Sequence, residues 1–388
     1  MQASTPPVDR GISTSNSRRS TAELLWEACR RHPRPEVVRD AIGRGADLHV
    51  ASKASIDHRI APLLWRTLTS ADAAESLGEG RATLRDVFEV YRMEALLLLP
   101  RAVSLAVRPL TEADFEPVVL KGPALASRYP EPGLRPMEDI DLLLPSEQHQ
   151  DALRALAGAG WVVVRSAHRG DYDTVLTHPD VPSLALELHY GLEYGSQRVT
   201  ALDATELWRL RQPIDCFGTP AFGLPLPEEI VYLAAHAGKP HHGFFRMIWV
   251  ADFAMIVGLA HQEGHDVDWG RVQTVAAASS CATVVAAALA LARRAGVDAP
   301  EEVFPLPTSG WRGAAIRQLT DVSWPLAHLE LPGYHLNYAL ADTRRSRWRI
   351  LVVLLGSGYG IGRAWRRLVH APAAWAARST STRRRRRV

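Results

Sequence analysis

Apolar residues recur at three- and four-residue spacing through the first part of the chain. The pattern runs through TAELLWEACRR, SIDHRIAPLLWRTL and LRDVFEVYRMEALLLLPRAVSLAV. Such spacing gathers apolar side chains on one face of a helix. We therefore predict a helical region over residues 21–115, with Ser20 or Thr21 capping its first helix. The polar residues 1–20 that precede it are predicted to be disordered.

The pattern changes to strands near residue 116. A short β-branched run at 117–120 predicts a first strand, and Pro123 then suits the first position of a short helix. Further predicted strands are DIDLLL, WVVVRS, DTVLTH and SLALELHY, and SEQHQDALRALAGAG is a predicted helix. We expect a small mixed β-sheet with at least two helices over about residues 116–195, within a core at 116–225.

Beyond residue 226 the helical spacing returns. The segments PEEIVYLAAHAG, FFRMIWVADFAMIVGLA, WGRVQTVAAASS and CATVVAAALALARRAG predict a C-terminal helical domain at 226–304. Residues 305–388 are rich in Trp, Pro and Arg and form an extension with a basic tail. The expected fold class is α+β, a small mixed sheet flanked by N-terminal and C-terminal helical regions.

The composition is that of an ordinary globular protein. The 388 residues are 47% hydrophobic and 22% charged, which suffices for a sizeable core. The net charge of +3 is too small to indicate nucleic-acid binding by itself. Three cysteines, far apart and odd in number, predict neither a zinc site nor a disulfide framework. Since the N-terminus shows no signal-peptide pattern, a cytoplasmic location is expected.

The C-terminal tail carries five consecutive arginines at 383–387. Such a run is typical of a flexible, solvated end, and its alternative is weak contact with nucleic acid or an anionic membrane. The apolar run at 350–355 is too short to span a bilayer, and we favour a buried helix over an interfacial segment there. Aromatic and basic residues do not alternate as on a base-stacking platform, which argues against nucleic acid as a partner.

Acidic residues at strand spacing make the middle of the chain the main candidate site. Asp139 and Asp141 share one face of a predicted strand, roughly 7 Å apart at Cα. Glu187 and His189 share one face of a later strand. If the two strands are neighbours, three carboxylates converge, and a divalent cation relieves their repulsion. Gly122, just before a predicted helix, suits the approach of a phosphate.

Together these motifs resemble a known family. An LKG turn followed by a helix, then RPMEDIDLLLP, then an ELH strand are similar to the uncharacterised nucleotidyltransferase family with the DNA polymerase β-type fold. HRIAPLLWRTL and HAGKPHHGFFRMIWVADFAMI extend the resemblance to about residues 20–300. It implies transfer of a nucleoside monophosphate from a nucleoside triphosphate, with ATP as the expected donor, and release of pyrophosphate. The implied acceptor is a small molecule or a protein, and the implied cofactor is Mg²⁺ or Mn²⁺.

The resemblance also assigns roles to individual residues. Asp139 and Asp141 would hold the metal ions. Glu187 would complete the ion that activates the acceptor nucleophile and take up its proton. Gly122 would let backbone N–H groups approach the β- and γ-phosphates.

One departure from the wider superfamily affects phosphate binding. The serine that usually follows the motif glycine is Pro123 here, so a hydroxyl and an N–H donor are missing. Lys121 or Arg135 would have to supply phosphate contacts instead, Arg135 in a bidentate manner. The simpler alternatives are that Lys121 only extends from a strand end and that Arg135 forms a salt bridge with Glu138 or Asp139.

Simpler explanations exist for the other candidates. The D-x-D segment could be a solvated edge strand, Glu187 a member of a surface ion pair, and His189 a hydrogen-bond partner. His189, His236 and Asp252 are candidates for acceptor binding. On a helix, however, Asp252 shares a face with Arg246, which suits a structural contact between two domains.

Two other functions compete with nucleotidyl transfer. A non-catalytic protein that binds nucleotide or a partner protein fits the missing serine, although all three acids are retained. A metal-dependent phosphohydrolase would need a cluster of His and Asp around the metals. The histidines at 236–242 fall in a different predicted domain, so only a structure that places them beside Asp139 would favour this reading.

Overall fold

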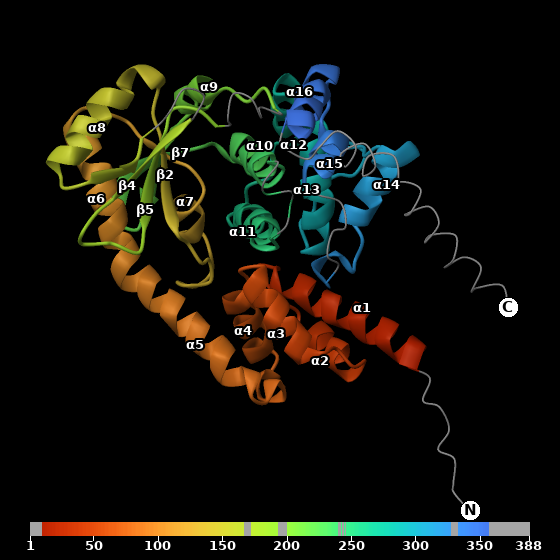
Figure 1. The fold of residues 1–388 in the computed structure, drawn as a ribbon. Coiled ribbons are helices and arrows are strands. Elements are labelled where there is room, and N and C mark those ends of the chain that lie inside the picture. The colour runs from red at the N-terminus through yellow and green to blue at the C-terminus, as the bar shows by residue number, and fades with distance from the viewer. Residues whose placement is uncertain are drawn as a thin grey trace, which may run out of the picture.

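In Figure 1 a seven-stranded mixed β-sheet lies at the left, the C-terminal helices lie to its right, and the first helices of the chain lie below them. The computed structural model describes residues 10–166, 172–192, 200–239, 242, 244, 246–326 and 333–356. Within this part of the chain the predicted α+β class is confirmed. The five-arginine tail lies outside the described residues.

Six α-helices form the N-terminal part: α1 Arg10–Ala28, α2 Pro35–Gly43, α3 Leu48–Asp57, α4 Ala61–Ser70, α5 Gly80–Met93 and α6 Leu99–Glu112. Residues 10–20 belong to α1, so the predicted disorder of this stretch is wrong. Ser20 and Thr21 are buried inside α1 rather than at its cap, and the Thr21 hydroxyl donates to the Ser17 carbonyl (2.7 Å). The helix expected across SIDHRIAPLLWRTL is interrupted, because Arg59 adopts a φ of 58° between α3 and α4.

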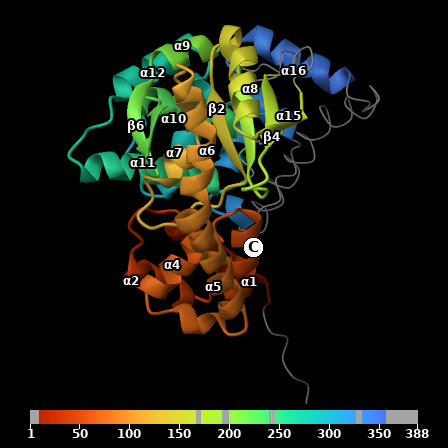
Figure 2. The same ribbon diagram turned by 90° about the vertical axis from the view of Figure 1, so that its left-hand side faces the viewer.

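Helices α5 and α6 run on from each other and connect the N-terminal helices to the sheet (Figure 1). A π-helical turn at Glu94–Leu98 joins them, so this segment is helical throughout, as predicted. Figure 2 shows α6 and α8 (His149–Gly158) on the side of the sheet that faces the viewer. Helix α6 packs there through small and branched residues, which are Ala102, Val103, Ala106, Val107 and Leu110.

The strands of the sheet are β1 Val118–Val119, β2 Asp139–Leu143, β3 Val162–Arg165, β4 Asp173–Thr177, β5 Ala185–His189, β6 Gln212–Cys216 and β7 Thr219–Gly223. Their spatial order is β3-β4-β5-β2-β1-β7-β6. β2 therefore lies in the interior, parallel to β5 and antiparallel to β1. The alternative that the D-x-D segment is a solvated edge strand is wrong.

Side chains of β2 alternate between two hydrophobic clusters. Ile140 and Leu142 point into the cluster formed with α6 and α8. Leu143 points into the second cluster, which joins the N-terminal and C-terminal helices. Asp139 and Asp141 share this second face, and Asp141 is completely buried. The alternation predicted from the sequence thus directs both carboxylates to one side of the sheet.

The β6–β7 hairpin at one edge of the sheet was not predicted. Its two-residue turn, Phe217-Gly218, has positive φ at both positions (54° and 77°). Such a turn matches the twist of two antiparallel strands, and glycine is usual at its second position. β7 pairs with β1 and leads directly into the C-terminal helices.

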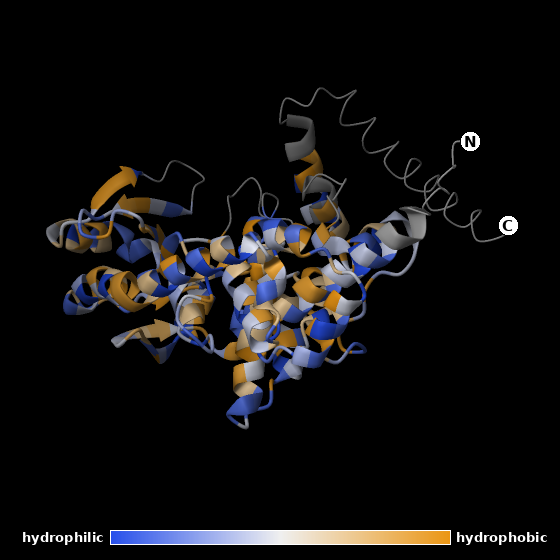
Figure 3. Ribbon diagram, turned by 90° about the horizontal axis from the view of Figure 1, so that it is seen from below, coloured by the Kyte–Doolittle hydropathy of each residue, from blue (hydrophilic) through white to orange (hydrophobic). Residues whose placement is uncertain are grey.

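Helix α9, Ala204–Arg209, lies between β5 and β6 in the chain. The C-terminal part consists of α10 Leu226–Ala237, α11 Ile248–Gln262, α12 Trp269–Ala278, α13 Ala282–Arg294, α14 Gly310–Leu319, α15 Gly333–Leu340 and α16 Arg344–Gly356. Helices such as α10, α11 and α13 share one hydrophobic core with α1–α4. Both hydrophobic and hydrophilic residues occur along the helices in Figure 3. None of the described helices has the length and hydrophobicity needed to cross a membrane.

A buried salt bridge ties the loop before β2 to α11. Arg135 Nε and Nη2 lie 2.7 and 2.9 Å from the two oxygens of Asp252, so the pair is bidentate. The Tyr129 hydroxyl also donates to Asp252 (2.7 Å). Burial and the Asp252 charge raise the pKa of Tyr129, so its hydroxyl stays protonated. The partner of Arg135 is therefore neither Glu138 nor Asp139, and Asp252 serves the structural contact suggested for its helix face.

We predict that Asp252→Ala lowers the free energy of unfolding by about 3–5 kcal/mol, because it leaves the Arg135 guanidinium buried without its carboxylate. Urea denaturation followed by circular dichroism measures the change. Asp151→Ala, which removes an exposed ion pair with Arg154, is the control and should cost about 1 kcal/mol or less. Equal losses in the two variants would contradict a stabilising role for the buried pair.

Candidate active site

The candidate site forms where β2 and β5 lie side by side. In their parallel register Asp141 is opposite Glu187, and Leu143 is opposite His189. Residues two apart on a strand point the same way, so Asp139, Asp141, Glu187 and His189 all project from one face of the sheet. The predicted convergence of the three acids is thus accounted for by strand pairing.

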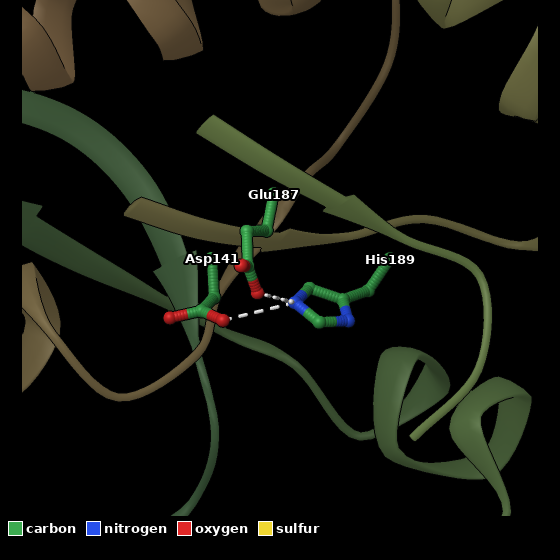
Figure 4. A group of neighbouring side chains, drawn as sticks. All are labelled: Asp141, Glu187 and His189. Carbon is green, nitrogen blue, oxygen red and sulfur yellow. Dashed lines mark hydrogen bonds and ion pairs between the residues drawn. The ribbon is translucent and has the colours of Figure 1, made fainter. Parts of the chain in front are cut away.

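Asp141, Glu187 and His189 form a tight cluster (Figure 4). His189 Nε2 lies 2.9 Å from Asp141 Oδ1 and 3.5 Å from Glu187 Oε2. One potential ligand atom from each residue lies within 4.8 Å of the other two. Two carboxylates and an imidazole suit a divalent cation, with oxygen ligands favouring Mg²⁺ or Mn²⁺. The residues present therefore fit the metal that the family implies, with His189 as an additional donor.

Lys121 follows β1 and reaches across to the D-x-D pair. Its Nζ lies 2.8 Å from Asp141 Oδ2 and 3.6 Å from Asp139 Oδ2. The side chain is only 13% exposed, so the ammonium is held against the carboxylates rather than extended into water. A cation that binds between the two aspartates must displace it.

The charges of the cluster determine its protonation. The negative charge of Asp141 and burial raise the pKa of Asp139. Burial would raise the pKa of Asp141 too, but Lys121 and His189 lower it well below its usual range. Hydrogen bonds to Asp141 and Glu187 raise the pKa of His189 despite its burial. Lys121 and His189 thus keep Asp141 ionised without a metal.

Gly122 occupies a backbone conformation that requires glycine. Its φ is 48°, and an added Cβ would lie 3.3 Å from the carbonyl oxygen of Asp139. Pro123 begins the short helix α7, Pro123–Ala126, as predicted. This close approach of the turn to β2 places Lys121 over the aspartates.

A pocket of about 230 Å³ opens over these residues. Its lining comes from the sheet, from α10 and from the segment after α10, and consists of Lys121, Asp139, Asp141, Arg165, Tyr172, Asp173, Glu187, His189, Tyr232, His236, Lys239 and His242. His236, an acceptor-binding candidate, is among them. Gly122, Arg135 and Asp252 are not among the described lining residues, and the Arg135 guanidinium is engaged by Asp252 instead.

Comparison with known proteins assigns the chain to a family. A family model described as uncharacterised nucleotidyltransferase matches residues 45–295, well over half of the chain. The chain belongs to this family. No curated protein and no solved structure matches it. The matched residues run from just before α3 to the end of α13 and include the whole sheet and pocket.

Several pocket residues were not predicted from the sequence. The Tyr172 ring stacks on His189 with centroids 5.5 Å apart, and Lys239 Nζ lies 4.9 Å from the centroid of the Tyr172 ring. Asp173 is opposite His189 in the β4–β5 register and accepts a hydrogen bond from Arg165 (2.9 Å). The signal for Lys239 was its rarity, since the chain has three lysines and 42 arginines. The signal for Asp173 was its position at the start of a predicted strand.

We predict that Lys121→Met raises the affinity for Mn²⁺ about tenfold, or about 1.4 kcal/mol, because no ammonium then competes for the aspartates. Titration calorimetry with Mn²⁺ alone measures it. Lys53→Met, which changes an exposed lysine on α3, is the matched control and should leave the affinity unchanged. Unchanged or weaker Mn²⁺ binding by Lys121→Met would show that Lys121 does not occupy the cation position.

Proposed function

We propose that the protein is a metal-dependent nucleotidyltransferase. It transfers a nucleoside monophosphate from a nucleoside triphosphate, ATP in the first instance, to a small-molecule or protein acceptor and releases pyrophosphate. The observation that carries the proposal is the parallel pairing of Asp141 with Glu187 beside Asp139, inside a pocket, in a member of a nucleotidyltransferase family. A cytoplasmic location, where Mg²⁺ and ATP are both present, belongs to the same proposal.

The acidic residues carry the chemistry. Asp139, Asp141 and Glu187 would hold Mg²⁺ or Mn²⁺, which when bound stabilises negative charge on the phosphoryl oxygens. Glu187 is the more exposed of the paired acids and takes the proton of the acceptor group. The acceptor oxygen attacks the α-phosphorus, the bond to the β-phosphate oxygen breaks, and pyrophosphate leaves. His189 Nε2 contacts both Asp141 and Glu187 and would be an additional donor to the cation.

Fewer residues are proposed to bind phosphate than the sequence suggested. Lys121 lies beside the aspartates and is available to phosphates once a cation displaces it. Gly122 keeps its assigned role through its backbone N–H. The proposal does not use Arg135 for phosphate or Asp252 for the acceptor, because they are buried against each other. His236 is still a candidate for acceptor binding, because it lines the pocket.

A phosphohydrolase is the second candidate. His236 and His242 line the same pocket as Asp139, which is the placement that favours this function. Against it, the three-residue metal cluster found among the described residues includes His189 and neither of these two histidines. Two observations support the non-catalytic alternative. Pro123 replaces the serine of the motif, and the Lys121 ammonium lies against the aspartates.

We predict that Mg²⁺-dependent binding of a nucleoside triphosphate weakens about 100-fold in Asp141→Asn, or by about 2.8 kcal/mol, because the metal loses a charged ligand. Calorimetry with each of the four nucleoside triphosphates measures it and identifies the base. Glu147→Gln, which changes an exposed carboxylate, is the control and should bind as the wild type does. Binding that is indifferent to Mg²⁺ and to Asp141 would reject the proposal.

Product analysis separates the three functions. We predict that Glu187→Gln loses about 100-fold or more in pyrophosphate release, because it can no longer take a proton. Nucleotide binding should stay within about threefold, because Glu187 is assigned to the ion that activates the acceptor and not to the one that binds the nucleotide. Phosphorus NMR of ATP incubated with the protein and a pool of small-molecule acceptors follows the products. Release of inorganic phosphate with ADP would instead identify the phosphohydrolase, and bound but unchanged ATP the non-catalytic protein.

A further inference from the structure

We propose that Lys239 and Arg165 form a phosphate-binding subsite in the pocket, on the side of the carboxylates opposite Lys121. The inference deepens the proposed function and rests on it. The sheet order β4-β5-β2-β1 places Lys121 and the proposed subsite on opposite sides of the two strands that carry the acids. Lys121 follows β1, whereas Arg165 and the Tyr172–Asp173 pair belong to β3 and to the start of β4.

Lys239 is held at this position by aromatic packing. Its Nζ lies 4.9 Å from the centroid of the Tyr172 ring, and that ring stacks on His189 at an interplanar angle of 17°. His189 in turn contacts Asp141. Lys239 thus contacts Tyr172, which in turn contacts His189 of the metal cluster. Lys239 is only 8% exposed, and it lines the pocket. A cation this buried attracts an anionic ligand far more strongly than one in bulk water.

Arg165 supplies the second charge near the pocket mouth. Its Nη2 donates to Asp173 Oδ2 at 2.9 Å, which orients the guanidinium, and its side chain is 41% exposed. A guanidinium oriented in this way presents a planar set of donors that matches phosphate oxygens. Asp173 is 2% exposed, and its Oδ1 has no hydrogen-bond partner among the described residues. The wall beside the cations thus also offers an acceptor for a hydroxyl of the ligand.

The distribution of lysine supports a binding role. Only three lysines occur in a chain with 42 arginines, and two of them, Lys121 and Lys239, line this one pocket. The third, Lys53, is exposed on α3. Lysine offers a compact ammonium with three rotatable donors, which fits between close carboxylates where a guanidinium fork does not. The pocket therefore carries an ammonium on each side of its acids.

The shared chemistry of the ligand is a phosphate group. It comes either from the β- and γ-phosphates of the nucleotide or from a phosphate on the acceptor. In the first case the triphosphate extends over the metal cluster from Lys121 to Lys239. In the second the acceptor is a phosphorylated molecule, held next to Glu187 with its nucleophile toward the α-phosphate.

Calorimetry with Mg²⁺-tripolyphosphate, ATP and inorganic phosphate tests the subsite, with Mn²⁺ alone reporting the metal site. We expect Lys239→Met and Arg165→Gln each to weaken phosphate binding about tenfold or more and to leave the Mn²⁺ affinity unchanged. Lys239→Arg should recover part of the loss. Lys53→Met is the control, and Arg165→Gln, at an exposed position, covers the case in which Lys239→Met fails to fold.

The ligands distinguish the two sources. Parallel losses for tripolyphosphate and ATP assign the subsite to the nucleotide. Unchanged ATP affinity, with loss of inorganic phosphate binding to protein saturated with Mg²⁺ and a non-hydrolysable ATP analogue, assigns it to the acceptor. If neither Lys239→Met nor Arg165→Gln differs from Lys53→Met with any phosphate ligand, the subsite is rejected. That result leaves the proposed function standing, since the latter depends on Asp141.

Discussion

The site depends on one electrostatic constraint, which is the repulsion between carboxylates on two paired strands in the interior of the sheet. The β2–β5 register puts Asp141 opposite Glu187, with Asp139 beside them. Two like charges about 4 Å apart repel by about 4 kcal/mol at an effective dielectric constant of about 20, a large share of the stability of a domain. Lys121 and His189 offset this repulsion. The same acids then favour any divalent cation that can displace the ammonium.

The surrounding fold holds this arrangement in place. α6 and α8 cover one face of the sheet with apolar residues, so the acids are confined to the other face. The bidentate pair of Arg135 with Asp252 fixes the loop that enters β2 onto α11. α10 and the segment after it close the pocket with His236 and Lys239. Residues of the sheet and of α10 thus meet at the pocket because Val118 and Leu143 share one hydrophobic core with α10.

Local patterns predicted much of this, because they depend on near neighbours in the chain. Strand alternation placed Asp139 with Asp141 and Glu187 with His189, and the helix at Pro123 was expected. Contacts between residues far apart in the chain could not be predicted from local patterns. Nothing local showed that Arg135 would meet Asp252 or that Lys239 would lie over Tyr172. The register of β2 and β5, which brings the acids together, is likewise a property of the assembled sheet.

The most direct test of a metal-dependent nucleotide site is crystallographic. Crystals grown with Mn²⁺ and a non-hydrolysable ATP analogue allow the metal to be located by its anomalous scattering. We predict a peak bound by Asp139, Asp141 and Glu187, with the triphosphate beside it and Lys121 moved from the aspartates to a phosphate. A peak elsewhere, or an unmoved Lys121 with no metal at the aspartates, would contradict the account.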